Sequence, residues 1–227
     1  KANEMAEMIE LNRLLGAKTI TFYNHSSGPA VHKVLDYYSK RKAVEVVPWD
    51  VPVAVNKWPP DPNVQPQIHY FAQLLALNDC LYRHMFTSKY IVFTDLDEFI
   101  IPKNDYTWTG MIESGMPCSE GQGAYLFQNC FFRRNWPDVE LQDKSVQRLG
   151  LITQLKMKRE ANIWPHYSRS KYMVQPRLIV QVGVHFIFDF IDTSTEVHCE
   201  VPSETALLHH YRLWEDDAST MTQVYDN

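Results

Sequence analysis

The first half of the chain alternates helical and strand-like hydrophobic patterns. Apolar side chains recur at helical spacing in three segments, and short runs of β-branched and aromatic residues separate them. The helical segments are 5–16, 30–41 and 67–86, and the strand-like runs are 18–23, 43–49 and 90–94. Spacing of three to four residues predicts helices with one buried face, and the short runs predict strands. This alternation indicates an α/β fold with a mostly parallel central sheet, flanked by helices and joined by right-handed crossovers.

The second half has more strand-like patterns and fewer helical ones. Strands are predicted at residues 124–133, 172–174, 178–188 and 206–212. Residues 135–170 are polar and aromatic with little period, which indicates loops. Residues 50–66 hold five prolines and predict a long surface loop of the kind that often has a function.

Composition narrows the class of protein. The 227 residues are 45% apolar, which is sufficient for a hydrophobic core without disulfide support. The net charge is −5 and no long basic run occurs, which argues against a nucleic-acid partner. No apolar stretch approaches the roughly 20 residues of a membrane span. None of the four cysteines forms a CxxC pair, so a structural zinc site is not expected, whereas free thiols and disulfides both fit.

Three acidic residues directly follow the run at 90–94. They are Asp95, Asp97 and Glu98, and open α/β sheets bind ligands at the carboxyl ends of their strands. Two carboxylates two positions apart can face the same side of an extended chain, and hard divalent cations prefer such oxygens. We therefore predict that Asp95 and Asp97 hold a divalent metal on the phosphates of a nucleotide donor. A solvated acidic turn is the alternative, and Glu98 is assigned no chemistry.

A third metal ligand is expected from a histidine in the second half. The predicted strand at 206–212 delivers His209 or His210 to its end, and His210 is the preferred candidate. His185 is the alternative candidate for the third ligand. Each of them alone could also be an ordinary surface or core histidine.

Polar residues near these positions are candidates for binding the donor. Arg212 lies close enough in sequence to His210 to meet a phosphate, and Lys171 and Arg177 could supply further positive charge. A solvated strand edge is the alternative for Lys171 and Arg177. Asn24 directly follows the first predicted strand, beside the expected nucleotide site. It also begins an Asn-His-Ser glycosylation sequence, but the position favours a role in the loop.

The order and spacing of several stretches resemble those of the family 92 glycosyltransferases, enzymes of the GT-A type. The matching stretches are residues 10–16, 21–24, Gln73 with 78–80, 93–99, 170–172 with 175–176, 183–185 and 210–212. They extend over nearly the whole chain. The set is far more specific than any one of its members.

The resemblance implies a single GT-A, Rossmann-like catalytic domain over residues 1–227. Residues 1–120 would bind the nucleotide sugar, and the strand-rich part at 121–227 would face the acceptor. The implied activity is inverting transfer of galactose from UDP-galactose, with Mn²⁺ or Mg²⁺, to a terminal galactose or fucose of a glycoprotein or glycolipid. The implied location is the Golgi membrane with a lumenal catalytic domain, whose first strand, stem and anchor would precede residue 1.

An inverting transferase needs a general base within hydrogen-bond reach of the acceptor hydroxyl. The available acids in the irregular region are Asp138, Glu140, Asp143 and Glu160. Spacing does not choose among them, so the catalytic base stays unassigned.

Two other functions compete with sugar transfer. A nucleotidyltransferase or sugar-nucleotide hydrolase also uses carboxylates and metal, but commonly has a glycine-rich phosphate loop. The chain has 8 glycines and neither GxGxxG nor GxxxxGK. A catalytically inactive glycan-binding protein is the second alternative, and the intact acidic stretch argues against it.

Overall fold

The computed structural model describes residues 2–55, 61–114, 116, 122–192, 198–214 and 221–226. Helices predominate before residue 90 and strands after it. The helices are α1 (Ala2–Leu14), α2 (Pro29–Lys40), α3 (Gln73–His84), α4 (Trp108–Glu113), α5 (Lys144–Leu149) and α6 (Ile152–Leu155), with 3-10 turns at Tyr70–Ala72 and Pro176–Leu178. The strands are β1 (Ile20–Asn24), β2 (Val44–Pro48), β3 (Ile91–Phe93), β4 (Glu98–Pro102), β5 (Ala124–Phe127), β6 (Asn129–Arg133), β7 (Lys158–Glu160), β8 (Lys171–Val174), β9 (Ile179–Val182), β10 (Ile187–Phe190), β11 (His198–Val201), β12 (Ala206–Arg212) and β13 (Gln223–Tyr225). Within these ranges no helix has the length and hydropathy to cross a bilayer.

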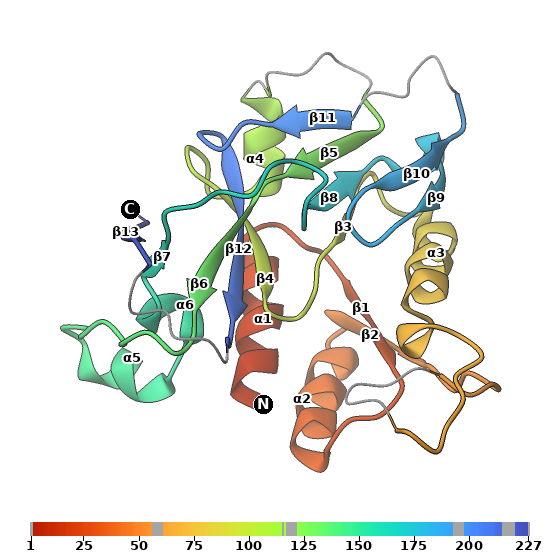
Figure 1. The fold of residues 1–227 in the computed structure, drawn as a ribbon, viewed down its shortest axis with the longest axis horizontal. Helices are drawn as coiled ribbons and strands as arrows, with labels where there is room; N and C mark the ends of the chain where they lie inside the picture. Colours follow the sequence, from red (N-terminus) through yellow and green to blue (C-terminus); the bar gives the residue numbers. More distant parts are fainter. Residues whose placement is uncertain are drawn as a thin grey trace.

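Two sheets form the centre of the molecule. One has the strand order β11-β5-β8-β3 and the other β4-β12-β6. Short connections join β3 to β4, β5 to β6 and β11 to β12, and each connection leads from the four-stranded sheet to the three-stranded one (Figure 1). Among the described strands of these two sheets, only β8 has no such partner. Strands from before and after residue 120 therefore lie in both.

Strand directions in these sheets are mixed. β11 with β5 and β12 with β6 run parallel, whereas β8 is antiparallel to β3 and β5, and β12 is antiparallel to β4. The mostly parallel central sheet expected from the sequence is therefore not confirmed. The protein is a mixed α/β structure with several small sheets, because β8 and β12, distant in sequence, pair antiparallel beside the strands that bracket the acidic turn.

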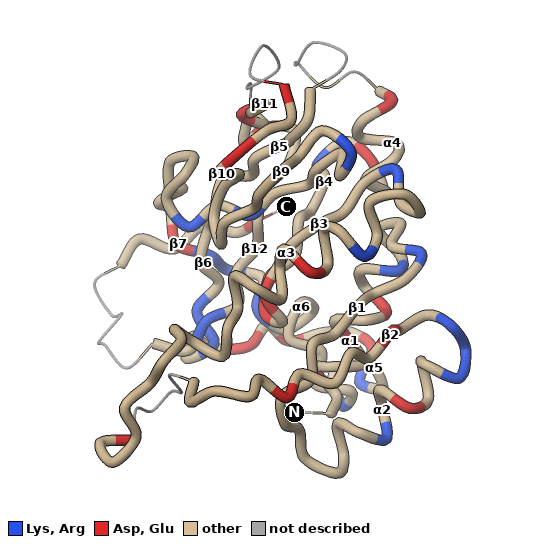
Figure 2. The backbone as a smooth tube through the Cα atoms, turned by 90° about the vertical axis from the view of Figure 1, so that its right-hand side faces the viewer, with Lys and Arg blue, Asp and Glu red and all other residues tan. Residues whose placement is uncertain are grey.

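Three smaller strand pairs surround this centre. β1 and β2 run parallel beside α2, as the sequence predicts, and β9 with β10 forms an antiparallel hairpin near α3 (Figure 1). β13 pairs antiparallel with β7. Basic and acidic positions are interspersed along the backbone (Figure 2).

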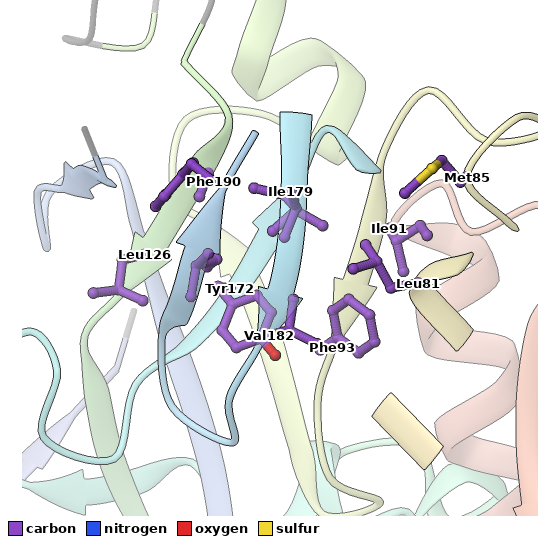
Figure 3. Close-up of a cluster of buried hydrophobic side chains, with 12 residues drawn as sticks. Leu81, Met85, Ile91, Phe93, Leu126, Tyr172, Ile179, Val182 and Phe190 are labelled. Atoms are coloured by element: carbon purple, nitrogen blue, oxygen red, sulfur yellow. The ribbon is translucent and has the colours of Figure 1, made fainter. Parts of the chain in front are cut away.

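A buried cluster joins α3 to the four-stranded sheet and the β9–β10 hairpin. Leu81 of α3 meets Phe93 of β3, Tyr172 of β8 and Ile179 of β9 in this cluster (Figure 3). A second cluster packs α1, α2 and the β1–β2 pair against one face of the three-stranded sheet. Burial of such apolar surface, at roughly 25 cal/mol per Å², is what holds these layers together.

Polar contacts tie α3 to β1 as well. The Tyr23 hydroxyl donates to Asp79 at 2.5 Å, and the Thr21 hydroxyl lies 2.9 Å from His84 Nε2. α3 thus contacts both the β1–β2 pair and the four-stranded sheet.

The sequence patterns located most elements of the first half but not all their bounds. The helix predicted at 67–86 begins only at Gln73, because Tyr70, Phe71 and Ala72 have φ of 38°, 54° and 59°, which an α-helix does not accommodate. The strands predicted at 124–133 and 178–188 are each two strands. The loops predicted at 135–170 contain α5, α6 and β7, and the patterns did not reveal α4, β4, β11 or β13.

Glu7 of α1 caps the distant helix α6. Its carboxylate accepts hydrogen bonds from the backbone N–H groups of Ile152 and Thr153, at 2.9 and 2.8 Å, and from the Thr153 hydroxyl at 2.7 Å. These N–H groups have no partner within their own helix, and a carboxylate also suits the positive end of the helix dipole. A buried acid thus fixes α6 to α1.

Glu7→Ala is expected to lower the free energy of unfolding by about 1–3 kcal/mol, since it leaves these donors buried without a partner. Urea unfolding would measure the difference. Glu113→Ala removes an exposed acid at the end of α4 and is the control. Equal stability of Glu7→Ala and the parent protein would show that the cap contributes nothing.

Asp226 fixes the β13 segment through charged contacts. Its carboxylate lies 3.0 Å from His209 Nε2 and 2.8 Å from Arg159 Nε. Burial acts to raise the pKa of Asp226, but the contacts with His209 and Arg159 outweigh it and hold the pKa well below its usual range. The ionised carboxylate is therefore the form that stabilises the fold.

The folded-state pKa of Asp226 is lower than the unfolded-state value of about 4. Its carboxylate therefore contributes to folding stability fully above about pH 4, and this contribution is lost as the pH falls through the folded-state pKa. Asp226→Asn should destabilise the protein by about 1–3 kcal/mol at pH 7. The difference in stability between Asp226→Asn and the parent protein should become smaller as the pH falls. Thermal melts from pH 7 to pH 3 would check this, and a gap that stays constant over that range would contradict the ion-pair role.

Candidate functional site

The acidic turn lies at the junction between the two central sheets, where β3 ends and β4 begins. Glu98 Oε2 accepts the Asp95 backbone N–H at 2.8 Å, and the Tyr211 N–H donates to the Asp97 carbonyl at 2.8 Å. The turn is thus fixed by β4 on one side and by β12 on the other. The side chains of Asp95 and Asp97 stay 45% and 43% exposed, whereas that of Glu98 is 2% exposed.

Lys171 lies beneath this turn at the start of β8. Its ammonium is 3.0 Å from Asp95 Oδ2 and 3.6 Å from Glu98 Oε2, and the side chain is 3% exposed. Burial alone would lower the pKa of Lys171, but the charges of Glu98 and Asp95 outweigh it and raise the pKa above its usual value. Burial also raises the pKa of Glu98, against the opposing charge of Lys171. The structure therefore places Lys171, predicted as a donor-binding residue, in direct contact with one of the two aspartates.

His210 approaches the same turn from β12. Its Nε2 lies 3.6 Å from Asp97 Oδ2, and its Nδ1 lies 3.2 Å from Glu98 Oε1 without hydrogen-bond alignment. Strand register explains this placement, since His210 is opposite Glu98 on β4 and Phe131 on β6. Burial acts to raise the pKa of Asp97, but His210, with a smaller contribution from Arg212, holds it below its usual value. Arg212 is exposed and close enough for its charge to act on Asp97.

The other candidate histidines lie differently. His185 Nδ1 is 3.1 Å from the Ser170 carbonyl, and burial lowers the pKa of His185, with Lys171 adding to the effect. His185 is therefore a neighbour of Lys171. His209 points to the opposite face of β12 from His210 and contacts Asp226.

Two residues that were predicted to bind the donor nucleotide do not contact the acidic turn. Asn24 ends β1, where its carbonyl accepts the Trp49 N–H at 3.0 Å. Arg177 follows the end of β8 opposite to Lys171, and its guanidinium donates to the Phe86 carbonyl at 3.3 Å. The structure thus brings together Asp95, Asp97, Lys171, His210 and Arg212, and leaves Asn24 and Arg177 outside that group.

The four candidate bases each have a local partner. Asp138 and Glu140 pair with Lys156 and Lys144, both at 2.6 Å. Asp143 accepts the Ser145 N–H at the start of α5, and Glu160 forms a buried pair with Arg133 at 2.5 Å. These contacts do not favour any one of them as a catalytic base.

Two residues near the turn were assigned no role from the sequence. Glu98 fixes the turn from beneath, and Gln73, at the start of α3, directs its amide to within 3.5 Å of Asp95 Oδ1. The signal for Gln73 was its place in the resemblance set. Periodicity could not find it, because the left-handed turn at Tyr70–Ala72 decides where α3 begins.

The chemistry of the donor set suits a divalent metal. Asp97 and His210 present an oxygen and a nitrogen 3.6 Å apart, a separation that two ligands of one cation can have, and Asp95 supplies a second exposed carboxylate. Within the described ranges no three such side chains already form a closed ligand group. Water and donor phosphates would therefore have to complete the shell, as they commonly do for Mg²⁺.

Lys171→Met is expected to destabilise the protein by about 3–5 kcal/mol, because it leaves the Glu98 carboxylate buried without its cation. Adding Glu98→Gln should recover much of this loss, since no unpaired buried charge remains. Lys40→Met breaks an exposed pair on α2 and should cost under about 1 kcal/mol. Urea unfolding of Lys171→Met, Glu98→Gln, the double variant and Lys40→Met measures the coupling, and additive losses from the two single substitutions would contradict the buried pair.

Comparison with known proteins agrees with the expectation from the sequence. The model of glycosyltransferase family 92 matches residues 1–227. The chain is 30% identical over 103 residues to the beta-1,4-galactosyltransferase galt-1 of Caenorhabditis elegans, a match that covers 44% of this chain and 22% of that protein. It is 28% identical over 132 residues to the galactan beta-1,4-galactosyltransferase GALS2 of Arabidopsis thaliana, covering 52% and 21%. The matched regions thus span about a fifth of each relative, while the family model extends over the whole sequence: the chain belongs to glycosyltransferase family 92.

Proposed function

We propose that this chain is the catalytic part of an inverting, metal-dependent galactosyltransferase with a GT-A type donor site. It would move galactose from UDP-galactose to a terminal galactose or fucose of an acceptor glycan on a glycoprotein or glycolipid. The observation that carries this is the grouping of two half-exposed aspartates with His210 and Arg212, above the buried Lys171–Glu98 pair. Family membership and the names of the two relatives support sugar transfer, and galactose in particular.

Asp95, Asp97 and His210 would hold the metal, Mn²⁺ or Mg²⁺. When bound, the cation would neutralise charge on the diphosphate as the nucleotide leaves. Lys171 and Gln73 orient the Asp95 carboxylate from two sides, and Glu98 fixes the backbone of the turn. The aspartates are thus positioned before any ligand arrives, which lowers the reorganisation needed at the moment of reaction.

Arg212 would meet the donor phosphates. It lies at the end of β12, two residues beyond His210 on the same face of the strand. A guanidinium can bind a phosphate through two parallel hydrogen bonds. Its location beside Asp97 suits a phosphate that shares the metal.

The proposal includes the cellular location that the resemblance to the family implies. The catalytic domain would face the Golgi lumen, and the full-length protein would be anchored in the membrane. Localisation of the tagged full-length protein, combined with protease protection of intact vesicles, would test this.

The deciding experiment measures UDP release from UDP-galactose by the full-length protein, with and without Mn²⁺, across acceptors that end in galactose or fucose. Manganese-dependent release that requires one acceptor supports the transferase. Release that is equal without acceptor would indicate hydrolysis, and release of a nucleoside monophosphate would indicate different chemistry.

Asp97→Asn should reduce metal-dependent transfer on the order of 100-fold or more, because it removes a charged metal ligand. The fold should be kept, since this side chain is half exposed. Asp36→Asn, on the exposed surface of α2, is the matched control and should retain activity. Removal of metal by a chelator should abolish transfer by the parent protein. Transfer by Asp97→Asn at the parent rate would exclude the metal role of Asp97.

A further inference from the structure

The segment that leads into β8 has an unusual backbone. Tyr167 and Arg169 have φ of 68° and 60°, in the left-handed region that residues other than glycine seldom adopt. Surrounding contacts hold the segment in place: the Tyr167 N–H donates to Ser170 Oγ at 3.1 Å, and His166 Nε2 lies 3.0 Å from the Val201 carbonyl. Strain of this kind concentrates where a side chain must be aimed for function. The side chain in question is that of Arg169, two residues before Lys171.

Arg169 is held by aromatic rings. Its guanidinium carbon lies 5.2 Å from the centre of the Trp164 ring and 5.7 Å from that of Phe131. In the part of the chain that the structure describes, the guanidinium has no hydrogen bond and no carboxylate partner. A guanidinium that packs on a ring face keeps its N–H groups available to a ligand.

Arg212 also packs on an aromatic ring. Its guanidinium carbon is 4.6 Å from the centre of the Trp214 ring, and among the described residues it too lacks a hydrogen bond and a carboxylate. Both indoles pack edge-on against Phe131, and Phe131 lies 4.9 Å from the His210 ring. Both arginines therefore pack on the aromatic group that contacts the proposed metal ligand His210.

The tryptophans are not optimised for stability. The indole N–H groups of Trp164 and Trp214 are buried, and the described residues offer neither a hydrogen-bond partner. A phenylalanine would avoid this cost, whereas an indole offers a guanidinium the larger ring face. Trp164 is also fixed by its backbone, whose N–H donates to the Asn129 carbonyl at 2.8 Å and whose carbonyl accepts from Gln128.

The charges of both arginines act on residues of the site. Arg212 acts on Asp97, and Arg169, after burial and Lys171, contributes to the lowered pKa of His185. Among the described residues these two guanidinium groups have no carboxylate partner, and they lie near a turn with two exposed carboxylates. This combination suits a ligand that carries several negative charges and a metal. A diphosphate has that chemistry.

We propose that Arg169 and Arg212 form a two-armed clamp for the diphosphate of the donor nucleotide, and that Trp164 and Trp214 position the two arms. The inference rests on the proposed function for its ligand and adds Arg169 and the two tryptophans to the donor site. Each arm binds phosphate oxygens through its N–H groups, and a metal held by the aspartates would supply further positive charge to the same diphosphate. The tryptophans act as positioning residues.

The test measures binding of UDP and of uridine to the full-length protein by calorimetry in the presence of Mn²⁺. Arg169→Ala should weaken UDP binding about 10- to 100-fold and leave uridine binding unchanged, since uridine has no phosphate. Arg169→Lys should restore only part of the affinity, because an ammonium lacks the planar fork. The control is Arg41→Ala, which removes an arginine that also packs on a ring, that of Tyr37, at the end of α2.

Trp164→Phe separates positioning from folding. The melting temperature should stay the same or rise, because an unpartnered N–H disappears, while UDP affinity falls less than in Arg169→Ala. Unchanged UDP affinity in Arg169→Ala, with a normal parent protein, would overturn the clamp. The clamp would also be overturned if Arg169→Ala raised only the KM for the acceptor, since Arg169 would then bind the acceptor.

Inorganic pyrophosphate without Mn²⁺ distinguishes failure of the clamp from failure of the proposed donor. If the parent protein binds pyrophosphate but not UDP, and Arg169→Ala loses that binding, the clamp stands and the UDP donor is wrong. If the parent protein binds neither, the clamp is wrong.

Discussion

The contact between Lys171 and Glu98 joins the two central sheets beneath the acidic turn. Lys171 belongs to the four-stranded sheet and Glu98 to the three-stranded one, so the pair crosses the junction where the chain passes from β3 to β4. Both side chains are almost fully buried, and each would be costly to bury alone. Because the Glu98 carboxylate also accepts the Asp95 N–H, the pair sets the shape of the turn that presents the aspartates. The proposed donor site thus depends on a buried charge pair beneath it.

Sequence patterns predicted the local features of this arrangement well. The run at 90–94 contains strand β3, as predicted, and Asp95 and Asp97 follow it with half-exposed side chains. Helices α1 and α2 and strands β1 and β2 also follow from local spacing. Family membership was confirmed, because a set of short motifs in fixed order contains more information than any single motif.

Long-range pairing could not be predicted in the same way. Whether β8 runs parallel or antiparallel to β3 depends on contacts between residues far apart in sequence, and nothing in the pattern of residues 171–174 specifies it. β4 was missed because its first residue, Glu98, looks like part of a solvated turn. Its burial becomes understandable only when Lys171 is placed beside it. Arg169 was overlooked for a related reason: its significance lies in a backbone conformation and in aromatic neighbours that sequence spacing does not reveal.

Strand β12 places two adjacent histidines in separate environments. Successive side chains of a strand point to opposite faces, so His209 meets Asp226 and the β13 segment, while His210 meets Asp97 and Glu98. A slip of this strand by a single residue would turn each imidazole to the opposite face of the sheet and break both sets of contacts at once. Insertions or deletions within residues 206–212 should therefore be tolerated far less well than substitutions. In a comparison of family members, the length of this segment should vary less than the identity of its individual residues.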